Sequence, residues 1–284
     1  MPAETLVDYG TFEAVGPMKI HLMHEGEGKP IILIHGFTAS LYTWRFNIPK
    51  LGEEFSVYAL DLPGFGYSDK PLDFDYTLDG YAKFITDFMD AKGIKKATIV
   101  GNSMGGGVAI KVATLFPDRV EKLVLIDSMG YPSESHFLPF TLMGIPVIGD
   151  VLMSLNYRAV VEKSLTGGVY YDNSFVTDEV VDAYYNVYAT ENAKKTPLIV
   201  IRTIFNAYPI TGDEIKSIAV PTLVLWGQSD NLIPVADSAA FGMDIGGACV
   251  VTYPEAGHMP QEEKADLVNN AIANFVKDGA CPSP

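Results

Sequence analysis

Six segments of the chain are apolar at most positions, and each ends at a small, polar or charged residue. Such runs are typical of strands that are buried on both faces of a parallel sheet. Two further segments, Thr11–Val15 and Met18–Met23, flank Gly16-Pro17 and predict an antiparallel hairpin. The six apolar segments are Pro30–Ile34, Phe55–Leu60, Ala97–Val100, Val120–Ile126, Thr222–Trp226 and Cys249–Tyr253.

Helical periodicity occurs between these strands. The alternation of strands and helices predicts an α/β fold with a doubly wound, mostly parallel sheet. In such sheets, functional residues gather at the carboxyl ends of the strands. The expected helices are Trp44–Leu51, Leu78–Lys92, Met104–Phe116, Ala236–Met243 and Gln261–Val276.

One interval, from Ser128 to Val220, breaks this alternation. A plain crossover needs only about a dozen residues. We therefore expect a helical cap, or lid, over residues 129–216, inserted between core segments 1–128 and 217–284. The apolar stretch Phe137–Leu155 is expected to roof a substrate pocket and pack on the core, with contact to lipid as an alternative. Prolines, glycines and an aspartate interrupt that stretch, which argues against a membrane span.

Composition narrows the class of protein. The chain has 284 residues, of which 48% are hydrophobic and 19% are charged, as expected of a globular protein with a large core. A net charge of −15 argues against nucleic acid or an anionic membrane as a partner. We expect a small hydrophobic substrate as partner, and the sequence leaves a homodimer open.

The two cysteines, Cys249 and Cys281, have no metal-ligand spacing, and a disulfide framework is not expected. The first residues lack the basic and apolar regions of a signal peptide, so the expected location is cytoplasmic. No metal is expected, because metal-ligand spacing is missing. No cofactor is expected, and a nucleotide in particular is disfavoured, because the chain has neither a dinucleotide-binding glycine motif nor a phosphate-binding loop.

The segment Gly101-Asn102-Ser103-Met104-Gly105 comes directly after the Ala97–Val100 strand. A serine on a tight strand-to-helix turn has a strained backbone and an accessible hydroxyl, and the residues two before and two after it must be small. Gly101 and Gly105 meet this requirement. The pattern predicts that Ser103 is a nucleophile, and the plainer alternative is an ordinary helix N-cap.

A serine hydroxyl needs a base to accept its proton and a third group to orient the base. Of the five histidines, His258 alone follows the last predicted strand, where it can reach Ser103. His21 and His24 in the hairpin are expected at the surface, and His136 lies in the insertion.

Two aspartates follow strands and fit the role of the acid. Asp230 is favoured, because Gly227-Gln228-Ser229-Asp230 forms a turn long enough to bend the carboxylate toward His258. Asp127 remains the alternative acid, and its other expected role is to cap the loop at the base of the lid. The order Ser…Asp…His holds with either residue.

The negative oxygen of a tetrahedral intermediate needs hydrogen-bond donors. We expect one from the backbone N–H of Met104, at the start of the helix after Ser103. The second is expected from the N–H of Phe37, because Gly36 lets the chain turn sharply after its strand. His35 is expected to brace this loop.

Five segments together resemble the α/β-hydrolase superfamily over nearly the whole chain, and this resemblance implies that fold and a lidded serine hydrolase. The segments are His35-Gly36-Phe37, Asp61-Leu62-Pro63-Gly64-Phe65-Gly66-Tyr67-Ser68, Gly101-Asn102-Ser103-Met104-Gly105-Gly106, Gly227-Gln228-Ser229-Asp230 and Gly257-His258. Epoxide hydrolases and haloalkane dehalogenases of this superfamily carry an aspartate at the position of Ser103, which disfavours both activities.

The favoured function is a carboxylesterase that cleaves small hydrophobic esters through an acyl-enzyme on Ser103. The alternative is a carbon–carbon bond hydrolase for meta-cleavage-type diketone acids, which the sequence around Ser103 resembles. Those enzymes typically carry a Gly-Pro-Gly-type loop and a Trp after the histidine, where this chain has Phe37-Thr38-Ala39 and Met259. Their substrate carboxylate would need an arginine, for which Arg158 and Arg202 are candidates. A third hypothesis is a hydrolase-fold ligand receptor.

Overall fold

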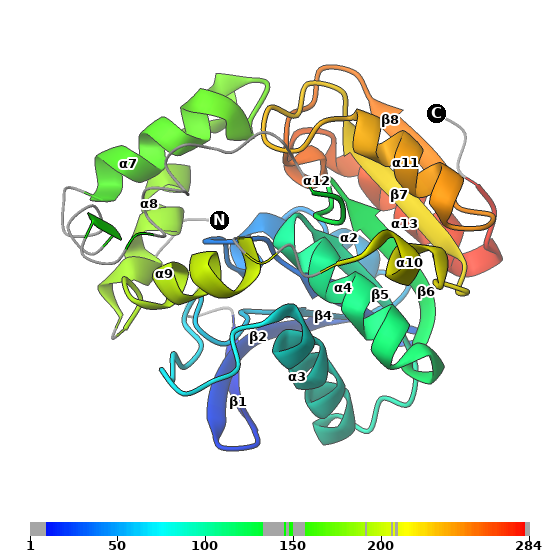
Figure 1. The fold of residues 1–284 in the computed structure, drawn as a ribbon, viewed down its shortest axis with the longest axis horizontal. Coiled ribbons are helices and arrows are strands. Elements are labelled where there is room, and N and C mark those ends of the chain that lie inside the picture. The colour runs from blue at the N-terminus through cyan, green and yellow to red at the C-terminus, as the bar shows by residue number, and fades with distance from the viewer. Residues whose placement is uncertain are drawn as a thin grey trace.

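The computed structural model of this chain is built on one eight-stranded sheet (Figure 1). The structure describes residues 10–132, 145, 148–149, 157–190, 192–205, 207 and 210–281. His136 and most of the Phe137–Leu155 stretch lie outside the described residues. The strands are β1 (Thr11–Val15), β2 (Met18–Glu25), β3 (Pro30–Ile34), β4 (Ser56–Leu60), β5 (Ala97–Asn102), β6 (Val120–Ile126), β7 (Thr222–Gly227) and β8 (Cys249–Tyr253).

The strand order is β1-β2-β4-β3-β5-β6-β7-β8. β2 pairs antiparallel with β1 and with β4, and all other neighbours are parallel. The mostly parallel sheet that the apolar runs predict is therefore confirmed. Each strand lies within a few residues of its predicted bounds. A strand that is buried on both faces must be apolar along its length, so the ends of the apolar run indicate where the strand begins and ends.

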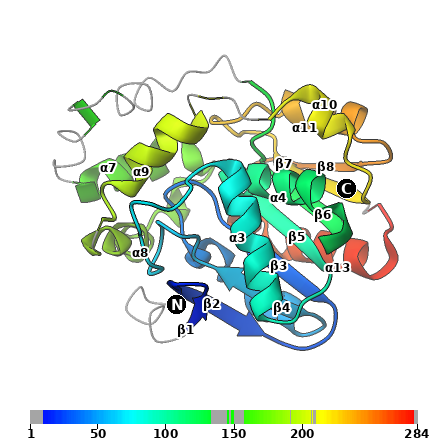
Figure 2. The ribbon, with the colours of Figure 1, turned by 60° about the horizontal axis from the view of Figure 1, so that its bottom comes forward.

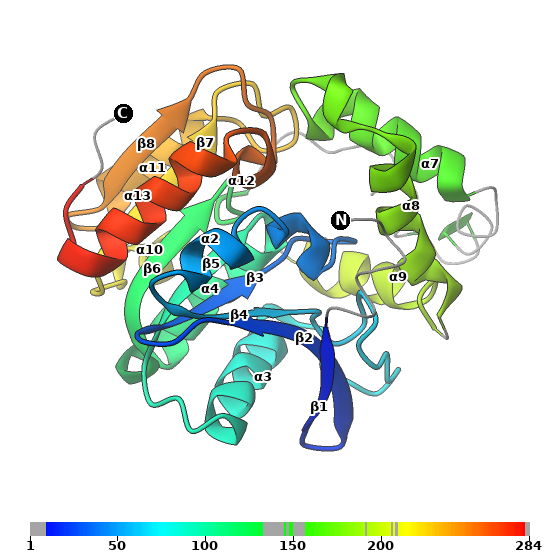
Figure 3. The ribbon, with the colours of Figure 1, turned by 180° about the vertical axis from the view of Figure 1, so that it is seen from behind.

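The two faces of the sheet form two separate hydrophobic clusters. Successive residues of β3 alternate between them: Ile31 and Leu33 belong to one cluster, and Ile32 and Ile34 belong to the other. α3, α4, α10 and α11 lie on one face, and α2 and α13 lie on the opposite face (Figures 1 and 3). The main helices of the core are α2 (Ile48–Gly52), α3 (Leu78–Ala91), α4 (Met104–Leu115), α10 (Gly212–Lys216), α11 (Ala236–Asp244), α12 (Pro260–Glu263) and α13 (Ala265–Asp278).

Two expected helices are each divided in the structure. The first is a 3₁₀ turn, Leu41–Trp44, followed by α2, because Pro49 has no N–H and starts a new helix instead of continuing one. The second is divided into α12 and α13 at Lys264, whose backbone leaves the helical region with φ −127° and ψ 39°. The apolar residues keep the same helical spacing on both sides of Lys264, so the sequence around this residue does not predict the break.

Three helices of the segment between β6 and β7 lie together on one side of the sheet, apart from α10 (Figures 1 and 2). They are α7 (Tyr157–Ser164), α8 (Asp178–Asn186) and α9 (Thr196–Val200). The short turns of the described chain are 3₁₀ at Leu41–Trp44, Pro117–Arg119, Asn173–Phe175 and Val187–Ala189, and π at Leu165–Val169 and Ile201–Phe205. In the described residues no helix is long and apolar enough to cross a bilayer.

The two cysteines are paired. Cys249 on β8 and Cys281, which follows α13, form a disulfide with a Cα–Cα distance of 5.4 Å. The expectation against a disulfide is therefore wrong. The two residues are 32 positions apart, and only the packing of α13 against the sheet returns the C-terminal segment to the edge strand.

Candidate active site

The predicted functional residues lie at the carboxyl ends of neighbouring strands. Ser103 follows β5, Asp127 follows β6, and Asp230 and His258 lie in the loops after β7 and β8. These four strands are consecutive and parallel in the sheet, so their ends meet at one edge. The topology therefore gathers residues that are far apart in sequence.

Ser103 has the strained backbone that the sequence predicts. Its φ is 57° and its ψ is −121°, in a region that non-glycine residues seldom adopt. Backbone hydrogen bonds fix this turn from both sides, since Ser103 N donates to Ile126 O (3.0 Å) and Gly106 N donates to Ser103 O (2.9 Å). Ser103 occupies the N-cap position of α4, but its side chain makes no capping hydrogen bond. The plainer N-cap interpretation is therefore wrong.

Gly101 and Gly105 are required by close approach of the backbone. A Cβ at Gly101 would lie 2.1 Å from the carbonyl oxygen of Gly105, and a Cβ at Gly105 would lie 2.3 Å from Ile34 O. Both distances are well inside van der Waals contact, and the atoms met are backbone atoms that have little freedom to move. The steric rule for the turn thus holds in this chain.

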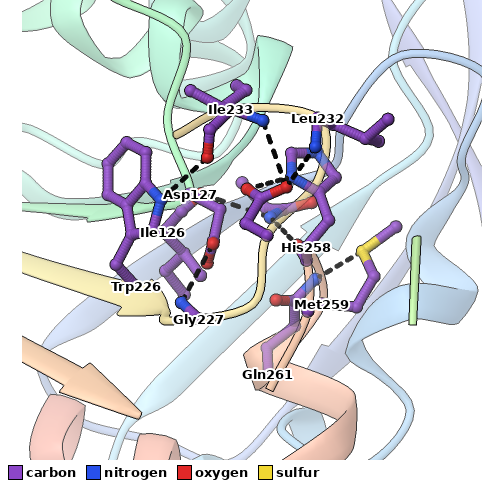
Figure 4. A network of polar contacts seen from close by, with 12 residues as sticks. Ile126, Asp127, Trp226, Gly227, Leu232, Ile233, His258, Met259 and Gln261 are labelled. Carbon is purple, nitrogen blue, oxygen red and sulfur yellow. Dashed lines mark hydrogen bonds and ion pairs between the residues drawn. The ribbon is translucent and has the colours of Figure 1, made fainter. Parts of the chain in front are cut away.

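His258 and Asp230 form a hydrogen bond. Nδ1 of His258 lies 2.7 Å from Oδ2 of Asp230, and both side chains are buried. The other oxygen of Asp230 accepts from the backbone N–H groups of Leu232 (2.7 Å) and Ile233 (3.1 Å), which converge beside His258 in Figure 4. Burial by itself would raise the pKa of Asp230, but His258 and these hydrogen bonds lower it. Asp230 is therefore ionised near neutral pH.

Asp127 has a different environment although it lies close by. Its Oδ1 accepts from Gly227 N (3.0 Å), its Oδ2 is buried, and its carboxyl group is close enough to that of Asp230 to share a hydrogen bond with it. Burial and the negative charge of Asp230 raise the pKa of Asp127 well above its ordinary value. The opposite shifts of the two pKa values favour the negative charge on Asp230, which contacts His258, over Asp127.

Asp127, Asp230 and His258 also meet the geometric requirement for an ion site. One oxygen of each aspartate and one ring nitrogen lie within 4.8 Å of one another. In the structure, however, Nδ1 of His258 bonds to Asp230, and an ion would have to displace this hydrogen bond. We therefore interpret His258 and Asp230 as a hydrogen-bonded pair and not as ligands of an ion.

Asn102 connects the serine turn, which is the turn between β5 and α4 that carries Ser103, to the histidine loop, which is the loop after β8 that carries His258. Its Nδ2 donates to the carbonyl oxygens of Ile126 and His258, each at 3.2 Å. The residue directly before Ser103 is thus bonded to the backbone of His258. No local sequence pattern predicts this role of Asn102, because a contact between β5 and a loop 156 residues later depends on the tertiary fold.

The loop after β3 packs directly on Ser103. A Cβ at Gly36 would lie 3.0 Å from the Cβ of Ser103. His35 is fully buried; its Nδ1 bonds to Gly36 O (2.7 Å), and its Nε2 accepts from Leu62 N (3.0 Å). Burial lowers the pKa of His35, so the ring is neutral and keeps both bonds. The expectation that His35 braces this loop agrees with these contacts.

A sequence-family model described as the alpha/beta hydrolase fold matches residues 29–265. The chain belongs to the α/β-hydrolase family. It is 30% identical to a 2-hydroxy-6-oxo-6-(2'-aminophenyl)hexa-2,4-dienoic acid hydrolase of Metapseudomonas resinovorans, over 93% of this chain and 90% of that protein. It is also 29% identical to human epoxide hydrolase 4, over 92% of this chain and 76% of that protein.

Solved structures of α/β-hydrolases extend this similarity to three dimensions. A meta-cleavage product hydrolase of Pseudomonas fluorescens IP01 superposes with a TM-score of 0.83 at 28% identity. The match covers 96% of this chain and 99% of that chain. The protein is therefore a hydrolase of this fold, and its relatives act on chemically different substrates.

In this hydrolase His21 is buried, which differs from the prediction. His21 was expected at the surface, but it is 1% exposed and its Nδ1 lies 2.8 Å from Oδ2 of Asp61. Asp61 also accepts from the N–H groups of Leu41 (2.7 Å) and Tyr67 (2.8 Å). β2 lies beside β4 in the sheet, so the hairpin histidine reaches the end of the neighbouring strand and becomes buried. His24 is exposed, as expected.

Two of the arginines of the hydrolase are held by carboxylates. Arg158 on α7 bonds to Asp178 (2.8 Å) and Asp182 (2.7 Å). Arg45 is buried and forms a 2.6 Å ion pair with Glu262 on α12, which further accepts from three hydroxyl groups. These groups belong to Thr43 (2.7 Å), Tyr170 (2.8 Å) and Tyr184 (3.0 Å). Arg202, the other candidate for a substrate carboxylate, is exposed.

Proposed function

We propose that this protein is a serine hydrolase that cleaves small hydrophobic carboxylic esters through an acyl-enzyme on Ser103. The observation that carries the proposal is the 2.7 Å bond between Asp230 and His258, in a loop that Asn102 ties to the Ser103 turn. A base that is oriented in this way can accept the proton of a serine hydroxyl.

In the proposed mechanism, Ser103 attacks the ester carbonyl and His258 Nε2 takes the hydroxyl proton. Asp230 holds the proton on Nδ1 and stabilises the imidazolium that forms. His258 then gives the proton to the leaving alcohol, and the acyl group stays on Ser103. Water, deprotonated by His258 in the same way, hydrolyses the acyl-enzyme and releases the carboxylic acid.

The tetrahedral intermediates carry a negative oxygen that needs fixed donors. We assign this role to the backbone N–H groups of Phe37 and Met104. Met104 is the first residue of α4, where the N–H groups have no partner within the helix and the helix dipole is positive. The bonds of His35 and the packing of Gly36 on Ser103 support the position of Phe37.

The hydrophobic character of the substrate follows from the surroundings of Phe37. Its ring lies 6.0 Å from that of Phe65 and 4.9 Å from that of Phe205, which belongs to the segment between β6 and β7. We propose that this segment acts as the lid over residues 129–216, and that its aromatic contact with the oxyanion loop contributes an apolar wall. No strongly basic side chain is needed for such a substrate.

A second candidate is a carbon–carbon bond hydrolase with the same three residues. The similarity to meta-cleavage product hydrolases, which extends over more than nine-tenths of this chain, supports it. Substrates of that class carry a carboxylate, whereas the candidate Arg158 is already held by Asp178 and Asp182, and the candidate Arg202 is exposed at the surface. We therefore rank this candidate second.

A panel of substrates tests both candidates. Purified protein is given p-nitrophenyl esters of increasing acyl length and one vinylogous 1,5-diketone acid, and kcat/KM is measured for each. We expect turnover of the short esters that is abolished in Ser103→Ala. Ester turnover that survives in that variant would overturn the serine mechanism. Turnover of the diketone acid far faster than of any ester would establish the second candidate.

A further inference from the structure

We propose that Glu263 is a positioning residue for His258. It acts through hydrogen bonds that connect the histidine loop to residues 169–172 of the segment between β6 and β7. This inference rests on the proposed function, because it assigns His258 the role of the base. Glu263 does not touch the reacting atoms. Its effect would pass through the backbone of Gly257 and His258.

The carboxylate of Glu263 accepts three backbone N–H groups from two different parts of the chain. Oε1 accepts from Tyr171 (2.8 Å) and Asp172 (3.0 Å), and Oε2 accepts from Gly257 (2.7 Å). Burial raises the pKa of Glu263, and the hydrogen bonds from these three N–H groups oppose that rise, because they favour the carboxylate. Hydrogen bonds to a carboxylate are stronger than those to a neutral oxygen. Glu263 therefore joins the residue before His258 to a segment about 90 positions earlier.

The peptide groups of His258 itself are held from both sides. Its N–H donates to Val169 O (2.8 Å), and its carbonyl accepts from Asn102 (3.2 Å). A Cβ at Gly257 would lie 2.6 Å from Val169 O, so the two segments are in close contact. The imidazole thus projects from a backbone that the serine turn holds on one side and residues 169–172 hold on the other.

The neighbouring Glu262 also contacts this region, because its carboxylate accepts a hydrogen bond from the hydroxyl of Tyr170. It is unsuitable for a test, because its removal would leave the buried charge of Arg45 unpaired and destabilise the fold. Glu263 is only partly buried and lines an open surface cavity of about 580 Å³, together with Tyr171, Asp172 and Glu255. Its replacement therefore disturbs less packing.

The test compares Glu263→Gln with Glu255→Gln, a matched removal of one charge from the histidine loop. Glu255 is exposed and makes none of the bonds described above. The readouts are kcat and KM for a short ester, the melting temperature, and the rate at which a fluorophosphonate labels Ser103. The labelling rate reports activation of the serine by His258 and does not depend on which substrate is natural.

We expect Glu263→Gln to lower kcat and the labelling rate by about 10-fold or more, because a displacement of about 1 Å can reduce a rate about 100-fold. KM should change by less than about twofold, and Glu255→Gln should match the wild type. If Glu263→Gln is unfolded at the assay temperature, Glu263→Asp, whose shorter side chain is unable to reach both segments, is judged by the same criteria.

An unchanged labelling rate in a folded Glu263 variant would overturn this inference and leave the proposed function intact. A KM effect without a kcat effect would also overturn it, because the role would then lie in substrate binding. A wild-type protein that is not labelled at Ser103 would overturn the proposed function together with the inference.

Discussion

Replacement of each aspartate by asparagine should separate the roles of Asp230 and Asp127. In Asp230→Asn, the two N–H groups of Leu232 and Ile233 would hold the amide oxygen in the place of Oδ1. The amide NH₂ would then face Nδ1 of His258, which lies 2.7 Å from Oδ2 in the native protein. Nδ1 must accept this bond, so the ring proton moves to Nε2 and His258 is unable to take the proton of Ser103.

The expected loss for Asp230→Asn is about 10⁴-fold in kcat/KM, the effect of the wrong tautomer in serine hydrolases of this type. That factor corresponds to about 5 kcal/mol of transition-state stabilisation. Asp127→Asn should lose less than about fivefold. The raised pKa of Asp127 favours its uncharged form, its Oδ1 bond to Gly227 can be kept by the amide oxygen, and the amide has nearly the same shape.

The assay is kcat/KM for a short p-nitrophenyl ester near pH 8, with thermal unfolding of both variants as the control for folding. Both replacements exchange one carboxyl oxygen for an NH₂ group, and the two aspartates are buried neighbours. Each variant is therefore the control for the other. The reverse pattern, a large loss in Asp127→Asn and a small one in Asp230→Asn, would refute the assignment of the acid. Equal losses would refute the argument that Asp127 is protonated.

Two further predictions concern stability. Because the pKa of Asp127 is raised in the folded state, this group binds a proton that the unfolded chain has lost, and its contribution to stability should fall as pH rises above about 4, by up to about 1.4 kcal/mol per pH unit. In urea unfolding, the wild type should therefore lose stability relative to Asp127→Asn between pH 5 and 8, and a pH-independent difference contradicts this. Ser103→Gly should be about 1 kcal/mol more stable than Ser103→Ala, because glycine tolerates φ 57°, whereas alanine keeps the backbone strain. A lower melting temperature for the glycine variant than for the alanine variant would show that the strain is small.

Much of the fold could be predicted from the sequence, for a physical reason. A parallel sheet covered on both faces needs continuous apolar runs, and the six strands from β3 to β8 begin and end close to those runs. Chemistry at the carboxyl ends was also predictable, because strand ends are marked by the change from apolar to polar residues. Ser103 and His258 followed from this rule and from the glycines around Ser103.

The choice between the two aspartates illustrates where sequence reasoning ends. Asp127 and Asp230 both follow a strand, and position alone leaves both as candidates. The structure separates them, since Asp230 contacts His258 and two backbone N–H groups, while Asp127 is buried with one N–H group. The difference is electrostatic and depends on which groups the folded chain brings within a few ångströms.

The sequence by itself determined the sheet, the position of the serine turn and the set of residues at the strand ends, because these follow from local patterns of hydrophobicity and backbone sterics. Only the tertiary structure decided that His21 is buried against Asp61, that Cys249 pairs with Cys281, and that Glu263 links Gly257 to residues 171–172. These contacts bring together segments from 32 to about 90 residues apart, and the bond of Glu263 to Gly257, six positions away, links one of them to the histidine loop. No local pattern encodes such pairs, because each partner satisfies its own local rules equally well without the other.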